Sequence, residues 1–176
     1  MIRLFLIGFM ASGKTTLGRA LADDLGLTFI DTDNYIECRY RQTISQLFAT
    51  RGEEGFRQYE RSILHEVADF EDVVIAAGGG TPCHFDNMDY MNERGITVRL
   101  LCPPDVIFTR LRISHTPRPL VNGKTDDELR AYIADTLAAR EPFYSRAHYV
   151  FASHQLESRV QIAESVVRFK HDVLGM

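Results

Sequence analysis

The stretch Ile2-Arg3-Leu4-Phe5-Leu6-Ile7-Gly8-Phe9-Met10-Ala11-Ser12-Gly13-Lys14-Thr15 decides the fold of this chain. Its first part is a largely apolar run of strand length, and residues 8–15 form a loop of the pattern G-x-x-x-x-G-K-T. Leucines at every fourth position after the loop predict a helix, which Gly26 is suited to end. A strand, a glycine-bounded loop and a helix in this order are the context of a phosphate-binding loop. The alternative is a glycine-rich turn that binds nothing.

This loop carries the groups that hold a nucleoside triphosphate. Its backbone N–H groups would converge on phosphate oxygens at the positive end of the following helix. Lys14 would reach the β- and γ-phosphates, and the hydroxyl group of Thr15 would ligate Mg²⁺. The predicted nucleotide-binding residues of the loop are Ala11, Ser12, Gly13, Lys14, Thr15 and Thr16.

The composition indicates one globular domain. The chain has 176 residues, of which 45% are hydrophobic and 25% are charged, and its net charge is −4. This length supports one core, and the negative charge provides no basic field for nucleic acid or an anionic membrane. The apolar runs are far shorter than the ~20 residues that span a bilayer. The strand that begins at Ile2 leaves no room for a targeting peptide, so we expect a cytoplasmic protein, and nothing in the sequence requires more than a monomer.

The three cysteines, Cys38, Cys83 and Cys102, are widely spaced. Their odd number and spacing argue against a disulfide framework and against a zinc site. A reducing compartment fits this usage. Cys83 lies in a turn-like stretch, which leaves open whether it is a reactive thiol or a buried or incidental residue.

Four further apolar runs of strand length follow the first, at residues 27–30, 73–77, 96–101 and 149–151. They are continuously apolar, as expected for a parallel sheet that is covered on both faces. Helical stretches separate them. The sequence therefore predicts an α/β fold with a doubly wound, five-stranded parallel sheet.

Three amphipathic segments predict helices that pack on the sheet or on a neighbour. They span Glu53–Phe70, Asp127–Arg140 with Pro142 just beyond it, and Gln155–Val173. In the last of these the apolar residues are Leu156, Val160, Ala163 and Val167. Residues 115–124 contain two prolines and a glycine, which is typical of a loop from which a lid is built.

Ligands of an open α/β sheet bind beyond the carboxyl ends of its strands, where this chain carries acids and glycines. Asp31 and Asp33 follow the second predicted strand and would point the same way in an extended segment. One can hold Mg²⁺ while the other accepts a hydroxyl proton; the alternative is that either one caps the next helix. Gly78-Gly79-Gly80 follows the third strand and allows a ligand to approach the backbone closely, or else forms a tight turn with positive φ.

Arginines supply the positive charge that a kinase needs for the transferred phosphoryl group and an anionic acceptor. Arg57 lies one turn before Glu60, which can orient its guanidinium group. Arg110 lies on the stretch that leads into the loop, Arg118 lies between the two prolines, and Arg140 ends a predicted helix. Any single arginine is more often a solvated surface residue.

Together these features resemble the shikimate kinase family, from Ile2 to about Phe151. The resemblance rests on six ordered motifs: residues 8–15, Asp31-Thr32-Asp33, Gly52-Glu53-Glu54-Gly55-Phe56-Arg57 with Glu60, Gly78-Gly79-Gly80, Arg118-Pro119-Leu120 and Arg140-Glu141-Pro142-Phe143-Tyr144. The loop alone names only a superfamily, whereas the combination is specific. It implies a P-loop NTPase fold similar to nucleoside monophosphate kinases. Residues 1–176 would be one kinase domain, with substrate-binding helices at about 33–62 and a mobile lid at about 112–125.

The resemblance also implies a reaction. ATP, with Mg²⁺ as cofactor, would phosphorylate the 3-hydroxyl group of shikimate on the route to chorismate and aromatic amino acids. Asp33 would bind the hydroxyl groups and act as the base, and Asp31 would bind Mg²⁺ through water. Arg57 and Arg140 would clamp the carboxylate, with Glu60 positioning Arg57.

The remaining implied roles concern the lid, the adenine and the acceptor ring. Arg118 would close over the phosphates and act in catalysis with Lys14, and Arg110 would lie along the adenine. Gly79 would contact shikimate through its backbone, flanked by Gly78 and Gly80. Phe48 and Phe56 match aromatic positions beside the ring, although both can equally be core residues.

Three features depart from the family pattern. Ala11 stands where the family usually has glycine, which makes the loop less permissive. Val121 follows Arg-Pro-Leu where leucine is commoner. The stretch after Phe151 matches weakly, so the backbone that packs on the adenine is not assigned.

Two other readings compete with this one. A nucleotide-dependent switch would need a guanine-reading N-K-x-D segment, and residues 122–126 have the wrong spacing. A kinase with another acceptor, such as gluconate or a nucleoside monophosphate, would share the fold. Two arginines beside Asp33 and a glycine run favour a small polyhydroxy carboxylate.

Overall fold

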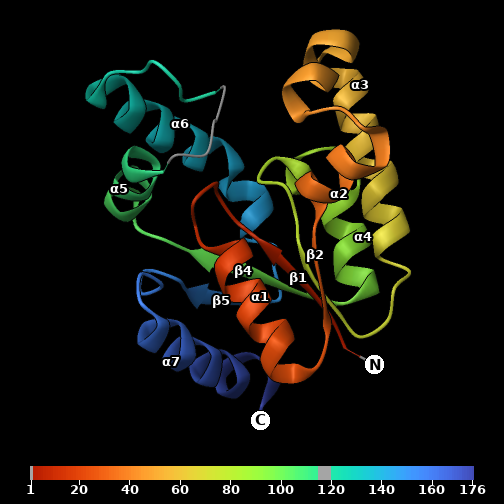
Figure 1. Cartoon of the computed structure of the whole chain (residues 1–176), viewed down its shortest axis with the longest axis vertical. Helices are drawn as coiled ribbons and strands as arrows, with labels where there is room; N and C mark the ends of the chain where they lie inside the picture. Colours follow the sequence, from red (N-terminus) through yellow and green to blue (C-terminus); the bar gives the residue numbers. More distant parts are fainter. Residues whose placement is uncertain (1, 115–119) are drawn as a thin grey trace.

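Five parallel strands form the centre of the protein (Figure 1). A computed structural model describes residues 2–114 and 120–176. The strands are β1 (Arg3–Ile7), β2 (Thr28–Asp31), β3 (Val73–Ala76), β4 (Ile96–Leu101) and β5 (Tyr149–Ala152). They lie in the order β2-β3-β1-β4-β5, and each neighbouring pair is parallel. The predicted doubly wound α/β fold is confirmed.

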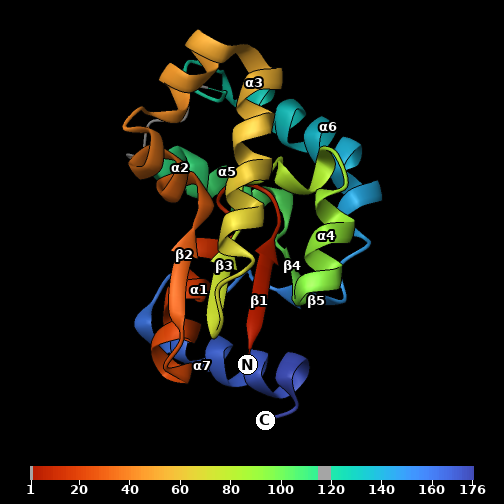
Figure 2. The same ribbon diagram turned by 90° about the vertical axis from the view of Figure 1, so that its right-hand side faces the viewer.

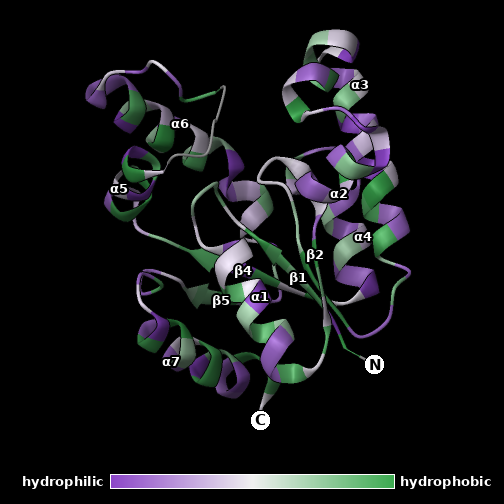
Figure 3. Ribbon diagram, in the orientation of Figure 1, coloured by the Kyte–Doolittle hydropathy of each residue, from purple (hydrophilic) through white to green (hydrophobic). Residues whose placement is uncertain are grey.

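Helices cover both faces of the sheet. Alternate residues of each strand point to opposite faces, so the apolar strands need cover on both sides. On one side Leu4 and Leu6 of β1 pack with helices α1 (Lys14–Leu25) and α7 (Arg159–Phe169). On the other side Phe5 and Ile7 pack with helices α3 (Ile44–Val67) and α4 (Asn87–Arg94). Figure 2 views the sheet from the side of α3 and α4, with α1 behind the strands. The central strands β1 and β4 are mostly hydrophobic in Figure 3, as expected for a sheet that is covered on both faces.

The remaining elements surround the carboxyl ends of the strands. They are α2 (Thr32–Tyr40), the short 3₁₀ helix η1 (Thr81–Cys83), α5 (Pro104–Ile113) and α6 (Asp126–Tyr144). The π-helical turn η2 (Lys170–Leu174) instead follows α7 directly and packs with it near the N-terminus of the chain. In Figure 1 the N-terminal part of α3 rises on one side of these strand ends, and α5 and α6 rise on the other. Among the described residues, no helix combines the length and apolarity needed to cross a membrane.

Several predicted helix boundaries shift. Gly26 ends α1 in the left-handed region, with φ 68°, as predicted. The helix predicted from Glu53 is the second half of α3, which bends at Gly52 with φ 67°. Helix α6 continues through Pro142 to Tyr144 instead of ending before the proline.

The prediction for the last helix was wrong in its start and in its buried face. Helix α7 begins at Arg159, where Ser158 forms a capping box, and not at Gln155. The side chains of Val160 and Val167 are 66% and 68% exposed. Val166 and Phe169 are buried against the sheet instead.

Candidate active site

The loop between β1 and α1 has the backbone of a phosphate cradle. Gly8 and Gly13 have φ angles of 145° and 98°, and Ala11 is also left-handed with φ 59°. Gly13 is the N-cap of α1 and has no side chain that could bind the free N–H groups of the first turn. These donors therefore remain for an anion. Lys14 Nζ donates to the carbonyl oxygens of Gly8 and Phe9, both at 2.9 Å, and so folds back over the loop.

Asp31 connects this loop to the end of β2. The Thr15 hydroxyl donates to Asp31 Oδ2 at 2.8 Å. Asp31 Oδ1 accepts from the backbone N–H groups of Asp33 and Asn34, at 3.1 and 3.4 Å. The capping alternative is therefore correct for Asp31, yet its second oxygen still faces the loop.

The contact between Thr15 and Asp31 fits a magnesium ion. Both atoms are hard oxygen donors, the type that Mg²⁺ prefers. Among the described residues there is no cluster of three or more His, Cys, Asp or Glu side chains arranged for a metal. A Mg²⁺ site needs only a few protein ligands when water and phosphate oxygens supply the others.

Asp33 lies in the first turn of α2, close to the backbone of Gly78. A Cβ atom added at Gly78 would lie 2.8 Å from Asp33 Oδ1 and 2.9 Å from Glu60 Oε1. Solvent reaches the carboxylate, but the protein atoms crowded around it raise its pKa to about 6, with the carboxylates of Asp31 and Glu60 adding to this effect. The Lys14 ammonium opposes the rise. Asp33 is thus able to exchange a proton near neutral pH.

The three glycines after β3 are required by close packing. None of them has a positive φ angle, so the tight-turn alternative for this segment is wrong. A Cβ atom at Gly79 would lie 3.0 Å from Arg140 Nη1, and one at Gly80 would lie 2.7 Å from Arg57 Nη1. The backbone here leaves no room for side chains because predicted site residues surround it.

Arg57 is held by carboxylates. Its Nη1 donates to Glu60 Oε2 at 2.5 Å and its Nη2 to Glu53 Oε1 at 3.3 Å. Glu60 is buried and accepts a second hydrogen bond, 2.8 Å long, from the Thr81 hydroxyl. The prediction that Glu60 orients Arg57 is confirmed geometrically, since the carboxylate is itself fixed.

Two aromatic rings lie beneath the Arg57 guanidinium group. Phe48 and Phe56 stack with their centroids 4.3 Å apart, and the guanidinium carbon lies 5.9 and 5.5 Å from them. Phe56 is a buried core residue, whereas Phe48 is only partly buried. The core interpretation holds for Phe56, and ring contact by Phe48 stays a prediction.

Arg140 has different surroundings. Its Nη1 donates to the Tyr144 hydroxyl at 3.4 Å, and its guanidinium carbon lies 5.6 Å from the ring of Phe9. Within the part of the chain that the structure describes, it forms no ion pair with a carboxylate. A half-buried guanidinium group that faces the glycine run without a carboxylate is suited to bind an anion.

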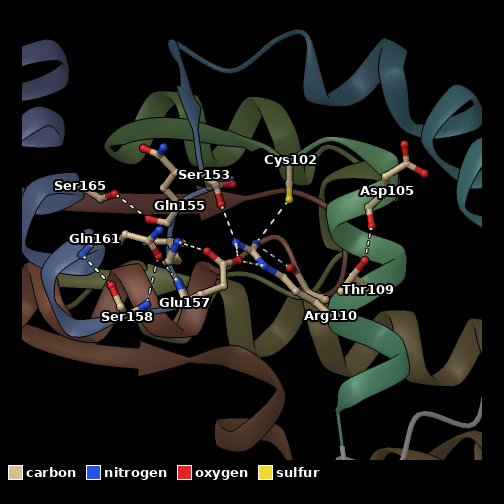
Figure 4. A network of polar contacts seen from close by, with 12 residues as sticks. Cys102, Asp105, Thr109, Arg110, Ser153, Gln155, Glu157, Ser158, Gln161 and Ser165 are labelled. Carbon is tan, nitrogen blue, oxygen red and sulfur yellow. Dashed lines mark hydrogen bonds and ion pairs between the residues drawn. The ribbon is translucent and has the colours of Figure 1, made fainter.

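Arg110, on α5, is hydrogen-bonded to the phosphate loop and to the segment before α7 (Figure 4). Its Nη1 donates to the Ala11 carbonyl at 3.1 Å, and its Nη2 to the Ser153 carbonyl at 3.1 Å. Glu157 Oε1 accepts from both Nε and Nη2, at 3.0 and 2.6 Å. Cys102 Sγ lies 3.4 Å from Nη1. The arginine thus borders the nucleotide end of the predicted site, while the predicted lid residue Arg118 lies outside the described residues.

Sequence reasoning missed three residues that fix this site. The Thr32 hydroxyl accepts from the Gly78 N–H group at 2.9 Å. The Tyr144 hydroxyl donates to the Gly79 carbonyl at 2.6 Å, and Glu157 holds Arg110. Thr32 lies in the motif Asp31-Thr32-Asp33 and Tyr144 ends the motif that begins at Arg140, and these motifs could have indicated both residues. Glu157 lies in the weakly matching C-terminal stretch, where no motif indicated it.

The three cysteines, Cys38, Cys83 and Cys102, are free thiols. Burial raises the pKa of the Cys83 and Cys102 thiols, which makes both less reactive.

Comparison with known proteins decides between the acceptors that this fold can serve. The family model described as "Shikimate kinase" matches residues 10–170. The chain belongs to the shikimate kinase family. A shikimate kinase of Bacteroides thetaiotaomicron is 54% identical over 170 residues, which cover 97% of each sequence.

Solved structures of shikimate kinases agree with this membership. A crystal structure of shikimate kinase from Bacteroides thetaiotaomicron has a TM-score of 0.97 at 52% identity and covers 99% of both chains. A shikimate kinase from Acinetobacter baumannii, solved in complex with shikimate, has a TM-score of 0.87 at 31% identity. That match covers 99% of this chain and 94% of the other. The shikimate kinase family uses ATP.

Proposed function

We propose that this shikimate kinase transfers the γ-phosphoryl group of ATP to the 3-hydroxyl group of shikimate. The observation that carries the proposal is the meeting of three parts at Gly78-Gly79-Gly80: Asp33, the two arginines and the phosphate loop. Transfer to a hydroxy acid needs a base, a carboxylate clamp and a phosphate donor close to one another. We propose that residues 1–176 act as one monomeric kinase domain in the cytoplasm.

On the donor side the loop of residues 11–16 would cradle the phosphates with its N–H groups. Lys14 would leave the carbonyls of Gly8 and Phe9 and contact the transferred phosphoryl group. Thr15, and Asp31 through water, would hold Mg²⁺, which when bound offsets the negative charge of the phosphates. Arg110 would lie along the adenine and Arg118 would close over the phosphates.

On the acceptor side two guanidinium groups would clamp the shikimate carboxylate. Arg140 lacks a carboxylate partner among the described residues, so its charge is available to the substrate. Arg57 already donates to Glu60 and Glu53. It would add a second contact to the carboxylate, and Glu60 would fix the direction of its guanidinium group. Bidentate arginine contacts give both energy and orientation.

Asp33 would act as the base of the transfer. The 3-hydroxyl oxygen attacks the γ-phosphorus, the bond from that phosphorus to the bridging oxygen of ADP breaks, and the hydroxyl proton passes to the Asp33 carboxylate. A pKa near 6 leaves this carboxylate ionised at neutral pH yet basic enough to accept the proton. Gly79 would contact the acceptor through its backbone.

The test is ADP release by the purified protein with shikimate, gluconate or CMP as acceptor, with and without Mg²⁺. We expect turnover with shikimate that EDTA abolishes. We expect the Asp33→Asn variant to lose turnover by orders of magnitude while it still binds ATP, because this residue faces the acceptor. Turnover with gluconate or CMP but not with shikimate would refute the proposed function.

Arg140→Ala tests the clamp separately. Removal of the guanidinium group should raise the KM for shikimate strongly and leave the KM for ATP nearly unchanged. An unchanged KM for shikimate would exclude Arg140 from acceptor binding.

A further inference from the structure

Tyr144, the last residue of α6, is a buried polar side chain for which the proposed reaction has so far no role. Its side chain is 1% exposed and packs with the cluster that contains Phe5 and Ile7. Its hydroxyl group donates to the Gly79 carbonyl at 2.6 Å and accepts from Arg140 Nη1 at 3.4 Å. One hydroxyl group therefore joins the glycine run to the guanidinium group.

We infer that Tyr144 is a positioning residue for the acceptor, and that its hydroxyl group holds the Arg140 guanidinium group against the backbone of Gly79. The ligand concerned is the carboxylate of the acceptor. This inference rests on the proposed function, because it assigns to Tyr144 the orientation of a group that the proposal places on that carboxylate.

The two arginines of the clamp are oriented in different ways. Arg57 is oriented by anions, since Glu60 and Glu53 both accept from it. Arg140 is oriented by the neutral Tyr144 hydroxyl group, and its guanidinium carbon also lies 5.6 Å from the ring of Phe9. A neutral partner fixes direction without competing for the positive charge, which leaves that charge for the ligand. The clamp thus combines one arginine whose charge is offset with one whose charge is free.

The Tyr144 ring also contacts Arg99 of β4. The guanidinium carbon of Arg99 lies 5.8 Å from the ring centroid. Arg99 itself donates to both carboxylate oxygens of Glu141, at 2.7 and 2.6 Å. Because Glu141 follows Arg140 directly, this pair anchors the same turn of α6 to β4.

The direction of the hydroxyl hydrogen bonds is also fixed. Burial raises the pKa of Tyr144 to about 12, so the hydroxyl group keeps its proton at neutral pH. A protonated hydroxyl group must donate to the Gly79 carbonyl and accept from Arg140, because a carbonyl cannot donate and a guanidinium group cannot accept.

The test is steady-state kinetics of Tyr144→Phe, which keeps the ring and removes only the hydroxyl group. We expect the KM for shikimate to rise about five- to tenfold, the range expected for one hydrogen bond, while kcat and the KM for ATP change less than about twofold. Ser165→Ala is the matched control, because it removes a buried hydroxyl-to-carbonyl bond, from Ser165 to Gln155 at 3.1 Å, on α7. The control should leave the KM for shikimate unchanged.

A double variant separates positioning from general packing. If Tyr144 acts through Arg140, then Tyr144→Phe should add little to the KM for shikimate in an Arg140→Ala background. An unchanged KM in the single variant, equal rises for both substrates, or additive effects in the double variant would overturn the inference. Wild-type protein that does not phosphorylate shikimate would instead refute the proposed function, so the two failures are distinguishable.

Discussion

Asp33 is the residue whose surroundings set the pH at which the proposed reaction can run. Crowding by protein and the carboxylates of Asp31 and Glu60 raise its pKa to about 6. Below that pH the carboxyl group is protonated and cannot accept the hydroxyl proton. We therefore expect kcat/KM for shikimate to fall about tenfold per pH unit below pH 6 and to level off above it.

A pH profile from 4.5 to 8 measures this limb. The Glu37→Gln variant is a useful comparison, because Glu37 is the weakest of the effects on Asp33 and its removal should lower the midpoint only slightly. If kcat/KM instead fell only near pH 4, the surrounding protein would not raise the pKa of the base in solution.

Ala11 is the residue at which this phosphate loop departs from glycine, and it carries backbone strain. Its φ angle of 59° lies in the left-handed region, which costs an L-residue roughly 1 kcal/mol. We expect Ala11→Gly to raise the free energy of unfolding by about 0.5 kcal/mol, since relief of strain exceeds the added chain entropy.

Urea unfolding measures this difference, with Ala134→Gly as control. Ala134 is an exposed residue within α6, where glycine should cost about 1 kcal/mol. Loss of stability in Ala11→Gly, of the size found in the control, would mean that the loop gains nothing from glycine.

At the scale of elements, the segment before α7 is joined to the phosphate loop through one ion pair. Glu157 holds Arg110, which also donates to the Ala11 carbonyl. Partial burial acts to raise the pKa of Glu157, but hydrogen bonds from Arg110 and the Leu156 N–H group outweigh it, and the pKa is lowered. We expect Glu157→Gln to raise the KM for ATP only about two- to fivefold, because the Glu157 side chain is half-exposed. The KM for shikimate should stay unchanged, because the pair borders the nucleotide end of the predicted site.

The control for this prediction is Asp69→Asn, which removes an exposed ion pair with Arg94 away from the nucleotide end. It should alter neither KM value. If Glu157→Gln changed only the KM for shikimate, Arg110 would not act at the nucleotide end of the site.

The elements also show where sequence patterns succeed and fail. The five strands were predictable because each contains a mainly apolar run of strand length, with helical stretches between the runs. The orientation of α7 was not, because this helix has apolar residues on two faces, with Val160 and Val167 on one and Val166 and Phe169 on the other. Periodicity alone cannot choose between them, whereas contact with Phe151 in the sheet does.

Two neighbouring valines test this assignment. Val166→Ala should lower the free energy of unfolding by roughly 1–3 kcal/mol, because it removes buried methyl groups. Val167→Ala should change it by less than about 0.5 kcal/mol, because that side chain is exposed. Equal losses measured by urea unfolding would contradict the observed face of α7.

At the scale of the whole molecule, the site is assembled from parts that are far apart in the sequence. Motifs singled out Lys14, Asp33 and Arg140 as candidate site residues one by one, since each lies in a local pattern. The long-range hydrogen bonds that hold the predicted site together could not be predicted in this way. Tyr144 and Gly79 are 65 positions apart, and Glu157 and Arg110 are 47 apart. Such pairs depend on how the sheet brings its carboxyl ends together, which no local pattern encodes.

This assembly crowds protein atoms and other acids around Asp33, and we expect the folded protein to be less stable at neutral pH as a result. The folded protein binds the Asp33 proton with a pKa of about 6, against 3.8 as the ordinary value. Below pH 3.8 the group is protonated in both states and costs nothing; as the pH rises to 6 the unfolded state ionises freely while the folded state resists, so stability falls. Asp33→Asn should therefore be more stable than the wild type at pH 7, with a difference that disappears toward pH 4.

Thermal unfolding of both proteins from pH 4 to 8 measures this difference. A variant that is inactive yet more stable is the expected signature of a residue kept for chemistry at the expense of folding. Asp69→Asn again serves as control, because its exposed ion pair should give a small difference that does not follow this pH course. If Asp33→Asn is less stable than the wild type at pH 7, favourable contacts of the Asp33 carboxylate outweigh its crowding, and the proposed balance between stability and catalysis does not hold for this site.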